Sequence, residues 1–234
     1  FSGHCYMEYA KYYAMTAETT RAYRQEIERL KKVYADQIDV FCGLEFDICC
    51  PDRPEGFDYV IGSLHGLNIN GIDYEFDGIA EHFRKMIQEH FAGDGMAFAK
   101  EYYRQLAWLP DYGDCDIIGH FDLITKFDEQ NHQYLENESY RKLAREALTE
   151  ALLSDSYFEV NTGAISRGYR SLPYPSEDLL YTLKKEGGKL ILSSDSHAAG
   201  TIDCYFEEAR AMLKDIGFEY VYALYDGAFV KDYL

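Results

Sequence analysis

Amphipathic segments alternate along this chain with short apolar runs, and most of these runs end in a polar residue. The amphipathic segments carry apolar residues at helical spacing, whereas the short runs are rich in β-branched and aromatic residues. The expected helices cover 16–34, 78–108 with a break near 93–95, 138–153, 175–186 and 203–216. The expected strands cover 38–42, 57–61, 115–118, 157–160, 189–192 and 220–223. This alternation predicts a parallel sheet with helical crossovers, either open and doubly wound or closed as a barrel.

Composition limits the classes of protein to which the chain can belong. Its 234 residues, 47% of them hydrophobic, are enough for one core, so we expect a single domain over residues 1–234. With 23 Lys and Arg against 41 Asp and Glu, the net charge is −18, which argues against nucleic acid or a membrane surface as a partner. No run approaches the roughly 20 apolar residues that span a bilayer. The six cysteines form no CxxC pair and are expected as reduced thiols in a cytoplasmic protein.

The polar residues that end the expected strands are of types that bind metals. These residues are Glu45, His65, His120, Asn161, Asp195 and His197. In a parallel barrel the carboxyl ends of all strands face one mouth, so these side chains would converge there. Imidazole and carboxylate suit Zn, Mn, Fe or Ni, and the absence of cysteine argues against a structural zinc site. Glu45 is the expected bridge between ions, and Asp195 and His197, two residues apart, would share a face of an extended segment.

Each of these residues also has a purely structural interpretation. A single histidine at the end of a strand is more often a hydrogen-bonded core residue than a ligand. Glu45 could cap a helix or lie on the surface, and Asp195 could cap the helix that follows it. Asp122 is expected to cap or to support the site. Three histidines end three separate apolar runs, and the residues alone leave the metal site and the structural interpretation equally open.

Five motifs resemble the PHP (polymerase and histidinol phosphatase) family, and within it the histidinol-phosphatase branch. They are Gly-Leu-Glu at 43–45, Tyr-Val-Ile-Gly-Ser-Leu-His at 59–65, Ile-Ile-Gly-His-Phe-Asp-Leu at 117–123, Glu-Val-Asn-Thr-Gly-Ala at 159–164 and Ser-Ser-Asp-Ser-His at 193–197. The resemblance implies a distorted, TIM-like (β/α)7 barrel. The family's His-x-His motif on the first strand would lie ahead of Phe1, so that strand is expected outside this sequence. Gly3 stands where many members have Asp.

The resemblance also implies an activity and a set of site residues. The activity is hydrolysis of L-histidinol phosphate to L-histidinol and phosphate, with two or three divalent ions, Zn, Mn or Fe, as cofactors. The implied metal ligands are His4, Glu45, His65, His120, Asp195 and His197. Glu45 would bridge two ions, His65 and His120 would complete one site, and Asp195 would serve the Glu45 side. His4 and His197 would share a third ion. His197 and Asp195 are also the expected catalytic residues, with His197 as a proton donor to the leaving alkoxide.

A phosphate group also needs a fixed positive partner, and Arg offers a bidentate fork that Lys does not. The resemblance favours Arg167 as the phosphate contact, followed by Arg170, and Asn161 as a further substrate contact. Two other functions stay open at this point. One is a PHP-type phosphoesterase that acts on another small phosphate or on nucleotides, although an exonuclease groove would need basic residues. The other is a homologue that binds metal without catalysis.

Overall fold

In the part of the chain that the structure describes, the main sheet consists of eight strands in the order β1-β2-β3-β6-β7-β8-β9-β10. The computed structural model describes residues 1–109 and 114–234. The strands of this sheet are β1 (Ser2–His4), β2 (Gly43–Asp47), β3 (Tyr59–Ser63), β6 (Ile117–Ile118), β7 (Tyr157–Asn161), β8 (Lys189–Ser193), β9 (Tyr220–Tyr225) and β10 (Ala228–Tyr233). Every pair from β1 to β9 is parallel, and only β10 runs antiparallel to its neighbour. A separate hairpin consists of β4 (Gly66–Ile69) and β5 (Ile72–Glu75).

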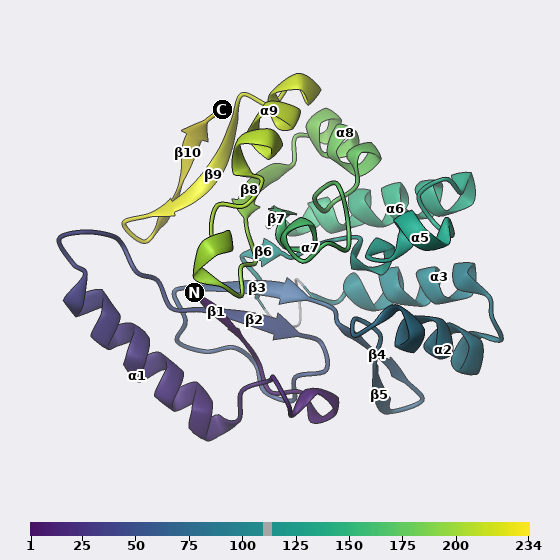
Figure 1. Cartoon of the computed structure of the whole chain (residues 1–234), viewed down its shortest axis with the longest axis horizontal. Coiled ribbons are helices and arrows are strands. Elements are labelled where there is room, and N and C mark those ends of the chain that lie inside the picture. Colours follow the sequence, from purple (N-terminus) through teal and green to yellow (C-terminus); the bar gives the residue numbers. More distant parts are fainter. Residues whose placement is uncertain (110–113) are drawn as a thin grey trace.

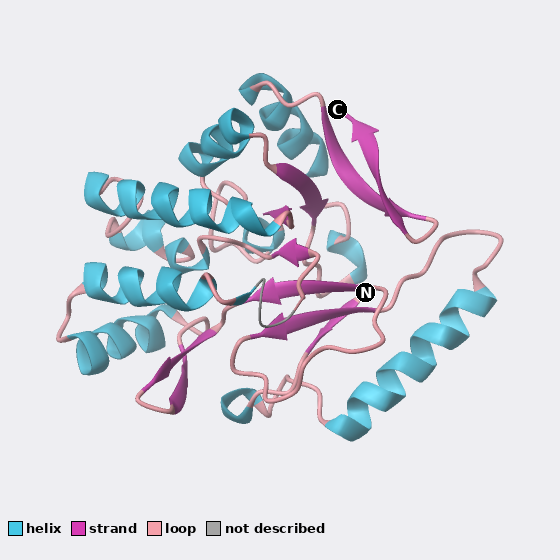
Figure 2. Cartoon of the chain, turned by 180° about the vertical axis from the view of Figure 1, so that it is seen from behind, coloured by secondary structure: helices cyan, strands magenta, loops and turns pink. Residues whose placement is uncertain are grey.

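Helices connect the parallel strands. They are α1 (Ala17–Val33), α2 (Ala80–Phe91), α3 (Gly95–Leu106), α5 (Asp128–Asn131), α6 (Glu138–Ala151), α7 (Gly163–Ser166), α8 (Glu177–Glu186) and α9 (Phe206–Ile216), with short 3-10 turns between some of them. Figure 1 shows α1 on one side of the molecule and α2, α3, α5 and α6 on the other, with the strands between them. The view from behind in Figure 2 shows the same arrangement. Within the described ranges no helix combines the length and apolar content needed to cross a membrane.

The predicted helices are confirmed, and local chemistry explains where they begin and end. Thr16 caps α1 with a capping box, and the Asp94 carboxylate accepts hydrogen bonds from the backbone N–H groups of Met96 and Ala97 at the start of α3. Gly187 ends α8 in the left-handed conformation, with a φ of 79°, which costs glycine little.

The first strand was predicted at the wrong position, about one strand length too early in the chain. Residues 38–42 form no strand and Ile38 is 64% exposed, whereas the strand lies over Gly43–Asp47. The β4–β5 hairpin and β10 were also absent from the prediction. The α/β fold with a parallel sheet is confirmed. Among the described residues no strand pairing joins the free edge of β1 to β9 or β10, so the predicted barrel stays a prediction.

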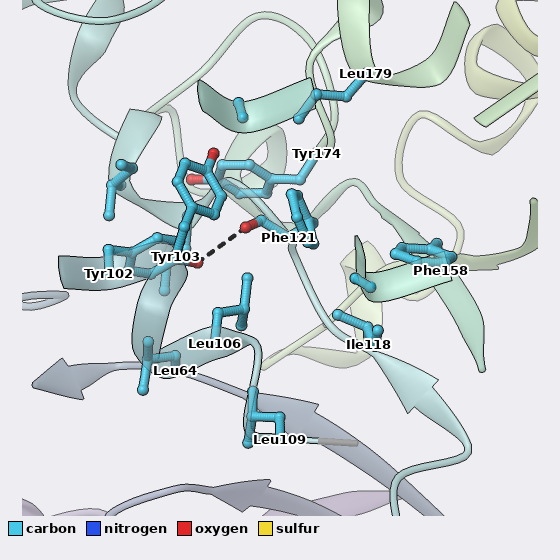
Figure 3. Packing of buried hydrophobic residues seen from close by; sticks show 14 of the residues in the cluster. Leu64, Tyr102, Tyr103, Leu106, Leu109, Ile118, Phe121, Phe158, Tyr174 and Leu179 are labelled. Atoms are coloured by element: carbon cyan, nitrogen blue, oxygen red, sulfur yellow. Dashed lines mark hydrogen bonds between the residues drawn. The ribbon is translucent and has the colours of Figure 1, made fainter. Parts of the chain in front are cut away.

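The core is rich in tyrosine, and three of its buried hydroxyl groups, those of Tyr102, Tyr103 and Tyr140, have partners inside the fold. The hydroxyl of Tyr102 donates a hydrogen bond to the backbone oxygen of Phe121 over 3.0 Å, as Figure 3 shows. The hydroxyls of Tyr103 and Tyr140 lie 2.8 Å apart and share a hydrogen bond between α3 and α6. Aromatic rings therefore fill the space between helices and sheet without leaving these polar atoms unpaired.

Replacement of Asp128 by alanine is expected to lower the free energy of unfolding by about 3 kcal/mol. The carboxylate is 4% exposed and accepts hydrogen bonds from three consecutive backbone N–H groups, those of Gln133, Tyr134 and Leu135, over 2.7 to 2.9 Å. Alanine would leave these three N–H groups, of which that of Tyr134 is buried, without a protein acceptor. Urea unfolding of both proteins measures the difference.

Glu146→Ala is the matched control for that prediction. Glu146 is an exposed acid on α6 whose Oε1 lies 3.8 Å from Lys142 Nζ, and such pairs contribute little. We expect a change within about 0.5 kcal/mol for this control. A loss below about 1 kcal/mol for Asp128→Ala would show that water replaces the carboxylate at those N–H groups.

Candidate metal centre

Glu45 lies at the centre of the site, with three imidazole rings around its carboxylate. The parallel register of β1 and β2 places His4 directly opposite Glu45, and His4 Nδ1 lies 3.3 Å from Glu45 Oε2. The other carboxylate oxygen, Oε1, lies 3.2 Å from His65 Nε2 and 3.3 Å from His120 Nε2. His65 follows β3 and His120 follows β6, so four strands supply these four side chains. One ligand atom from each of His4, Glu45 and His65 lies within 4.8 Å of the others.

The charges in this centre are strongly coupled. Burial would raise the pKa of Glu45, but His4, His65 and His120 outweigh burial and hold that pKa well below its usual value. Burial would lower the pKa of His65, but Glu45 outweighs it and holds the pKa well above the usual value. Burial would also lower the pKa of His120, but the hydrogen bond with Glu45 outweighs burial and raises this pKa. Burial lowers the pKa of His4. The centre therefore holds a buried carboxylate that cations stabilise, whether protons on imidazole or a metal ion.

Asp195, His197 and Arg167 form a second cluster on the same cavity. Arg167 Nη2 donates a hydrogen bond to Asp195 Oδ2 over 2.9 Å, and Arg167 Nη1 donates to the backbone oxygen of Asp195 and lies 3.0 Å from His197 Nδ1. Gly163 makes room for this cluster, because a Cβ there would lie 2.8 Å from Asp195 Oδ2. A cavity of about 370 Å³ is lined by all six predicted ligands, His4, Glu45, His65, His120, Asp195 and His197, and by Arg167.

The backbone at Asp195 differs from the expected one. The prediction that Asp195 and His197 share a face relied on an extended segment, but Asp195 has a φ of 43°, in the left-handed region. The two side chains still meet, with 3.9 Å between Asp195 Oδ1 and His197 Nδ1. The turn after β8, and not strand alternation, brings them together.

Asn161 and Arg170, the other predicted substrate contacts, do not line this cavity. Both polar groups of Asn161 are used inside the fold, since its Oδ1 accepts from the backbone N–H of Gly163 and its Nδ2 donates to Glu159. Arg170 is buried, donates a hydrogen bond to the hydroxyl of Thr125 and stacks at 4.3 Å on the ring of Tyr174. Their contribution to substrate binding stays a prediction, and in this structure both act as supports.

Two buried acids that the sequence analysis did not single out hold the histidines in place. Asp47 Oδ2 accepts a hydrogen bond from the backbone N–H of His65 over 2.7 Å and lies 3.3 Å from its Nδ1. Glu159 Oε2 accepts from the backbone N–H of His120 over 2.9 Å. Such partners orient metal-binding imidazoles. Asp47 could have been found from the sequence, because it stands two residues after Glu45 and so shares its face of β2.

Asp122 supports the fold, as expected. It is fully buried, and its Oδ2 accepts a hydrogen bond from the backbone N–H of Ser176, the residue that precedes α8. Its carboxylate therefore fixes the start of that helix.

The donor set fits a divalent metal. It combines imidazole nitrogens with carboxylate oxygens, has no cysteine, and lies in a cavity that leaves room for water and a small ligand. The buried Nδ1 atom of His120 has no hydrogen-bond partner among the described residues, and His4 Nδ1 has only its 3.3 Å ion-pair contact with Glu45. Fold and site together define an α/β protein with a candidate metal centre at one edge of a parallel sheet.

The known proteins to which this chain is similar in sequence include several histidinol-phosphatases. No family model matches it. The histidinol-phosphatase of Lactococcus lactis subsp. lactis is 28% identical over 207 residues, which cover 84% of this chain and 72% of that protein. The histidinol-phosphatase of Bacillus subtilis is 27% identical over 214 residues, which cover 83% of this chain and 76% of that protein. The chain is thus similar to histidinol-phosphatases, and the resemblance to that branch of the PHP family is confirmed.

A solved structure shows the same fold. The crystal structure of histidinol phosphate phosphatase from Lactococcus lactis subsp. lactis, complexed with Zn, L-histidinol and phosphate, matches with a TM-score of 0.67 at 21% identity. The match covers 99% of this chain and 86% of that one.

Proposed function

We propose that this protein is a histidinol-phosphatase, a phosphoric monoester hydrolase that converts L-histidinol phosphate and water to L-histidinol and phosphate. The observation that carries the proposal is the convergence of three imidazoles from separate strands on the Glu45 carboxylate, in the cavity that also contains Arg167. The curated relatives with this activity in their names support it. So does the related structure that contains Zn, L-histidinol and phosphate.

We further propose that six residues hold two or three divalent ions, Zn, Mn or Fe, with Glu45 as the bridge between two of them. The six are His4, Glu45, His65, His120, Asp195 and His197. When bound, such ions supply an activated water and neutralise charge on the phosphate. Because the pKa values of His65 and His120 are raised, bound protons compete with the ions, and metal affinity should fall as the pH falls.

The remaining steps belong to the chain's own groups. The Arg167 guanidinium is held by Asp195 and offers a fixed positive fork on the cavity wall, suited to two oxygens of a phosphate. Asp47 and Glu159 fix the orientation of His65 and His120. His197 has a largely exposed side chain beside Arg167, and we assign to it the transfer of a proton to the leaving alkoxide.

We also propose that the seven parallel strands, β1 to β3 and β6 to β9, form a distorted, TIM-like (β/α)7 barrel, in which the free edge of β1 turns toward β8 and β9. The support is a hollow of about 390 Å³ next to that edge. Its apolar lining includes Phe1, just ahead of β1, and Ile61, Ile117, Ile191 and Leu224 from β3, β6, β8 and β9.

Parallel assays on L-histidinol phosphate, an aryl phosphate and single-stranded DNA test the proposed function. We expect kcat/KM for L-histidinol phosphate to exceed that for the aryl phosphate by at least about 100-fold, since enzymes discriminate through contacts beyond the reacting group. A chelator should abolish the activity, and Zn, Mn or Fe should restore it. Equal turnover of the two phosphates would overturn the assignment of substrate. Faster cleavage of DNA would favour a nuclease instead.

A further inference from the structure

One wall of the candidate active-site cavity is acidic and lies outside the six predicted ligands. Glu75 is the last residue of β5, and Asp77 follows two residues later. Both line the cavity that contains His65 and Arg167, and both are partly exposed. Figure 1 shows the β4–β5 hairpin as an extension beyond β3, from which the chain returns to the body of the molecule at α2.

Each of these two carboxylates accepts a hydrogen bond at one of its two oxygens. Glu75 Oε1 accepts a hydrogen bond from the hydroxyl of Tyr12 over 2.6 Å. Asp77 Oδ1 accepts from Lys126 Nζ over 2.9 Å, and the same ammonium donates to the backbone oxygen of Asp77 over 2.7 Å. Lys126 lies 4.6 Å from the ring centre of Tyr169, which fixes its position further. The structure records no partner for the second oxygen of either acid within residues 1–109 and 114–234.

The charges of the two acids are not equivalent. Lys126 neutralises Asp77 at close range, whereas the partner of Glu75 is an uncharged hydroxyl group. Partial desolvation and the hydrogen bond to Glu75 raise the pKa of Tyr12, so this hydroxyl stays protonated and remains a donor. Glu75 therefore presents an uncompensated negative charge to the cavity.

Tyr174 gives an independent indication that a ligand binds in this cavity. Its side chain is 1% exposed and lines the cavity, and its hydroxyl makes no well-aligned hydrogen bond among the described residues, although the Arg170 guanidinium lies beside it. Burial raises the pKa of Tyr174, so the group is a hydroxyl that can both donate and accept. A buried hydroxyl without a partner is costly unless something in the cavity pairs with it.

We propose that Glu75 binds the ammonium group of the substrate, with Asp77 as a second acidic contact positioned by Lys126. The inference rests on the proposed function, since L-histidinol phosphate carries an ammonium group close to its phosphate. Arg167 and the metal centre attract the phosphate, and the acidic wall attracts the cationic part of the same molecule. Glu75 thus selects phosphomonoesters that also carry a positive charge over neutral or purely anionic ones.

The test compares two substrates that differ only in the amino group, L-histidinol phosphate and 3-(imidazol-4-yl)propyl phosphate. For Glu75→Gln we expect KM for L-histidinol phosphate to rise about 10- to 100-fold, the usual effect of losing a hydrogen bond between charged groups. We expect kcat/KM for the analogue without the amine to stay within about twofold, because that substrate makes no such bond. Glu75→Asp keeps the charge and should keep the preference for the amine. Glu81→Gln, an exposed acid on α2 nearby, is the matched control and should change neither value.

Each other outcome overturns the proposal in a distinguishable way. Equal losses on both substrates, with less bound metal by elemental analysis, would make Glu75 a metal ligand. No loss on either would place the ammonium elsewhere. A wild-type protein that hydrolyses both substrates equally well contradicts the selectivity but leaves the phosphatase function intact. A wild-type protein that hydrolyses neither overturns both proposals.

Discussion

Glu45→Gln is expected to lower kcat/KM for L-histidinol phosphate by at least about 10³-fold, equivalent to about 4 kcal/mol of transition-state stabilisation. The carboxylate oxygens of Glu45 lie 3.2 to 3.3 Å from nitrogens of three imidazoles. The Gln side chain has nearly the same shape but carries no negative charge. It can therefore neither neutralise a cation in the centre nor bridge two cations. Steady-state kinetics and elemental analysis of the purified variant measure the effect, and the metal content should fall together with the rate.

Glu28→Gln is the matched control for that experiment. It makes the same chemical change at an exposed acid on α1 that lies outside the candidate cavity, so activity and metal content should stay at the wild-type level. Circular dichroism of both variants tests whether the fold persists. If Glu45→Gln retained its full metal content and stayed within tenfold of the wild-type kcat/KM, Glu45 would not be a bridging ligand.

Arg167→Ala should raise KM and lower kcat/KM for L-histidinol phosphate about 10²- to 10³-fold, because a preorganised guanidinium contact to a phosphate is lost. The fork is already oriented by its two hydrogen bonds to Asp195. Arg167→Lys keeps the charge but loses the fork, so an intermediate value is expected. Both variants are compared with the wild type over a range of substrate concentrations.

Metal content separates the two roles that Arg167 could have. If Arg167 binds phosphate, the alanine variant should keep its metal, since the guanidinium is no metal ligand. Loss of metal together with activity would show instead that Arg167 acts by holding Asp195 in place. Arg29→Ala removes an exposed guanidinium on α1 and is the control. Kinetics within twofold of wild type for Arg167→Ala would remove this residue from the site.

The helices could be predicted well because their signals are local. A capping residue such as Asp94 and a terminating glycine such as Gly187 act on their immediate neighbours, so the sequence contains the whole interaction. The strands are harder to predict, because pairing depends on residues far away in the chain. The run at 38–42 has the composition of a strand but forms none, and its first two residues are exposed. Gly43–Asp47, in contrast, alternates apolar residues with Glu45 and Asp47.

The alternation of polar and apolar residues in β2 explains both why this strand was misplaced and how it supplies Glu45 to the candidate centre. In β2 the polar side chains face the candidate centre and the apolar ones, Leu44 and Phe46, are part of the core. Because a strand that contains buried acids has a low apolar content, a prediction based on apolar runs assigns it to a loop. Each histidine among the predicted ligands is predicted either from its position after an apolar run or from the resemblance. Asp47, by contrast, becomes meaningful only when its 2.7 Å contact with the His65 backbone is seen. Glu75 lies on a hairpin that no pattern predicted.

The parallel pairing of strands at the centre also means that the site forms only after distant parts of the chain have come together. Glu45 meets a histidine 41 residues before it, through the pairing of β1 with β2, and another 75 residues after it. Such contacts form late, because closing long loops has to precede them. A short fragment of this chain therefore lacks the site. Bound metal then stabilises only chains that have completed the sheet, and so shifts the equilibrium between unfolded and folded protein as a whole. In a cell, metal supply would act on the abundance of this protein as well as on its activity.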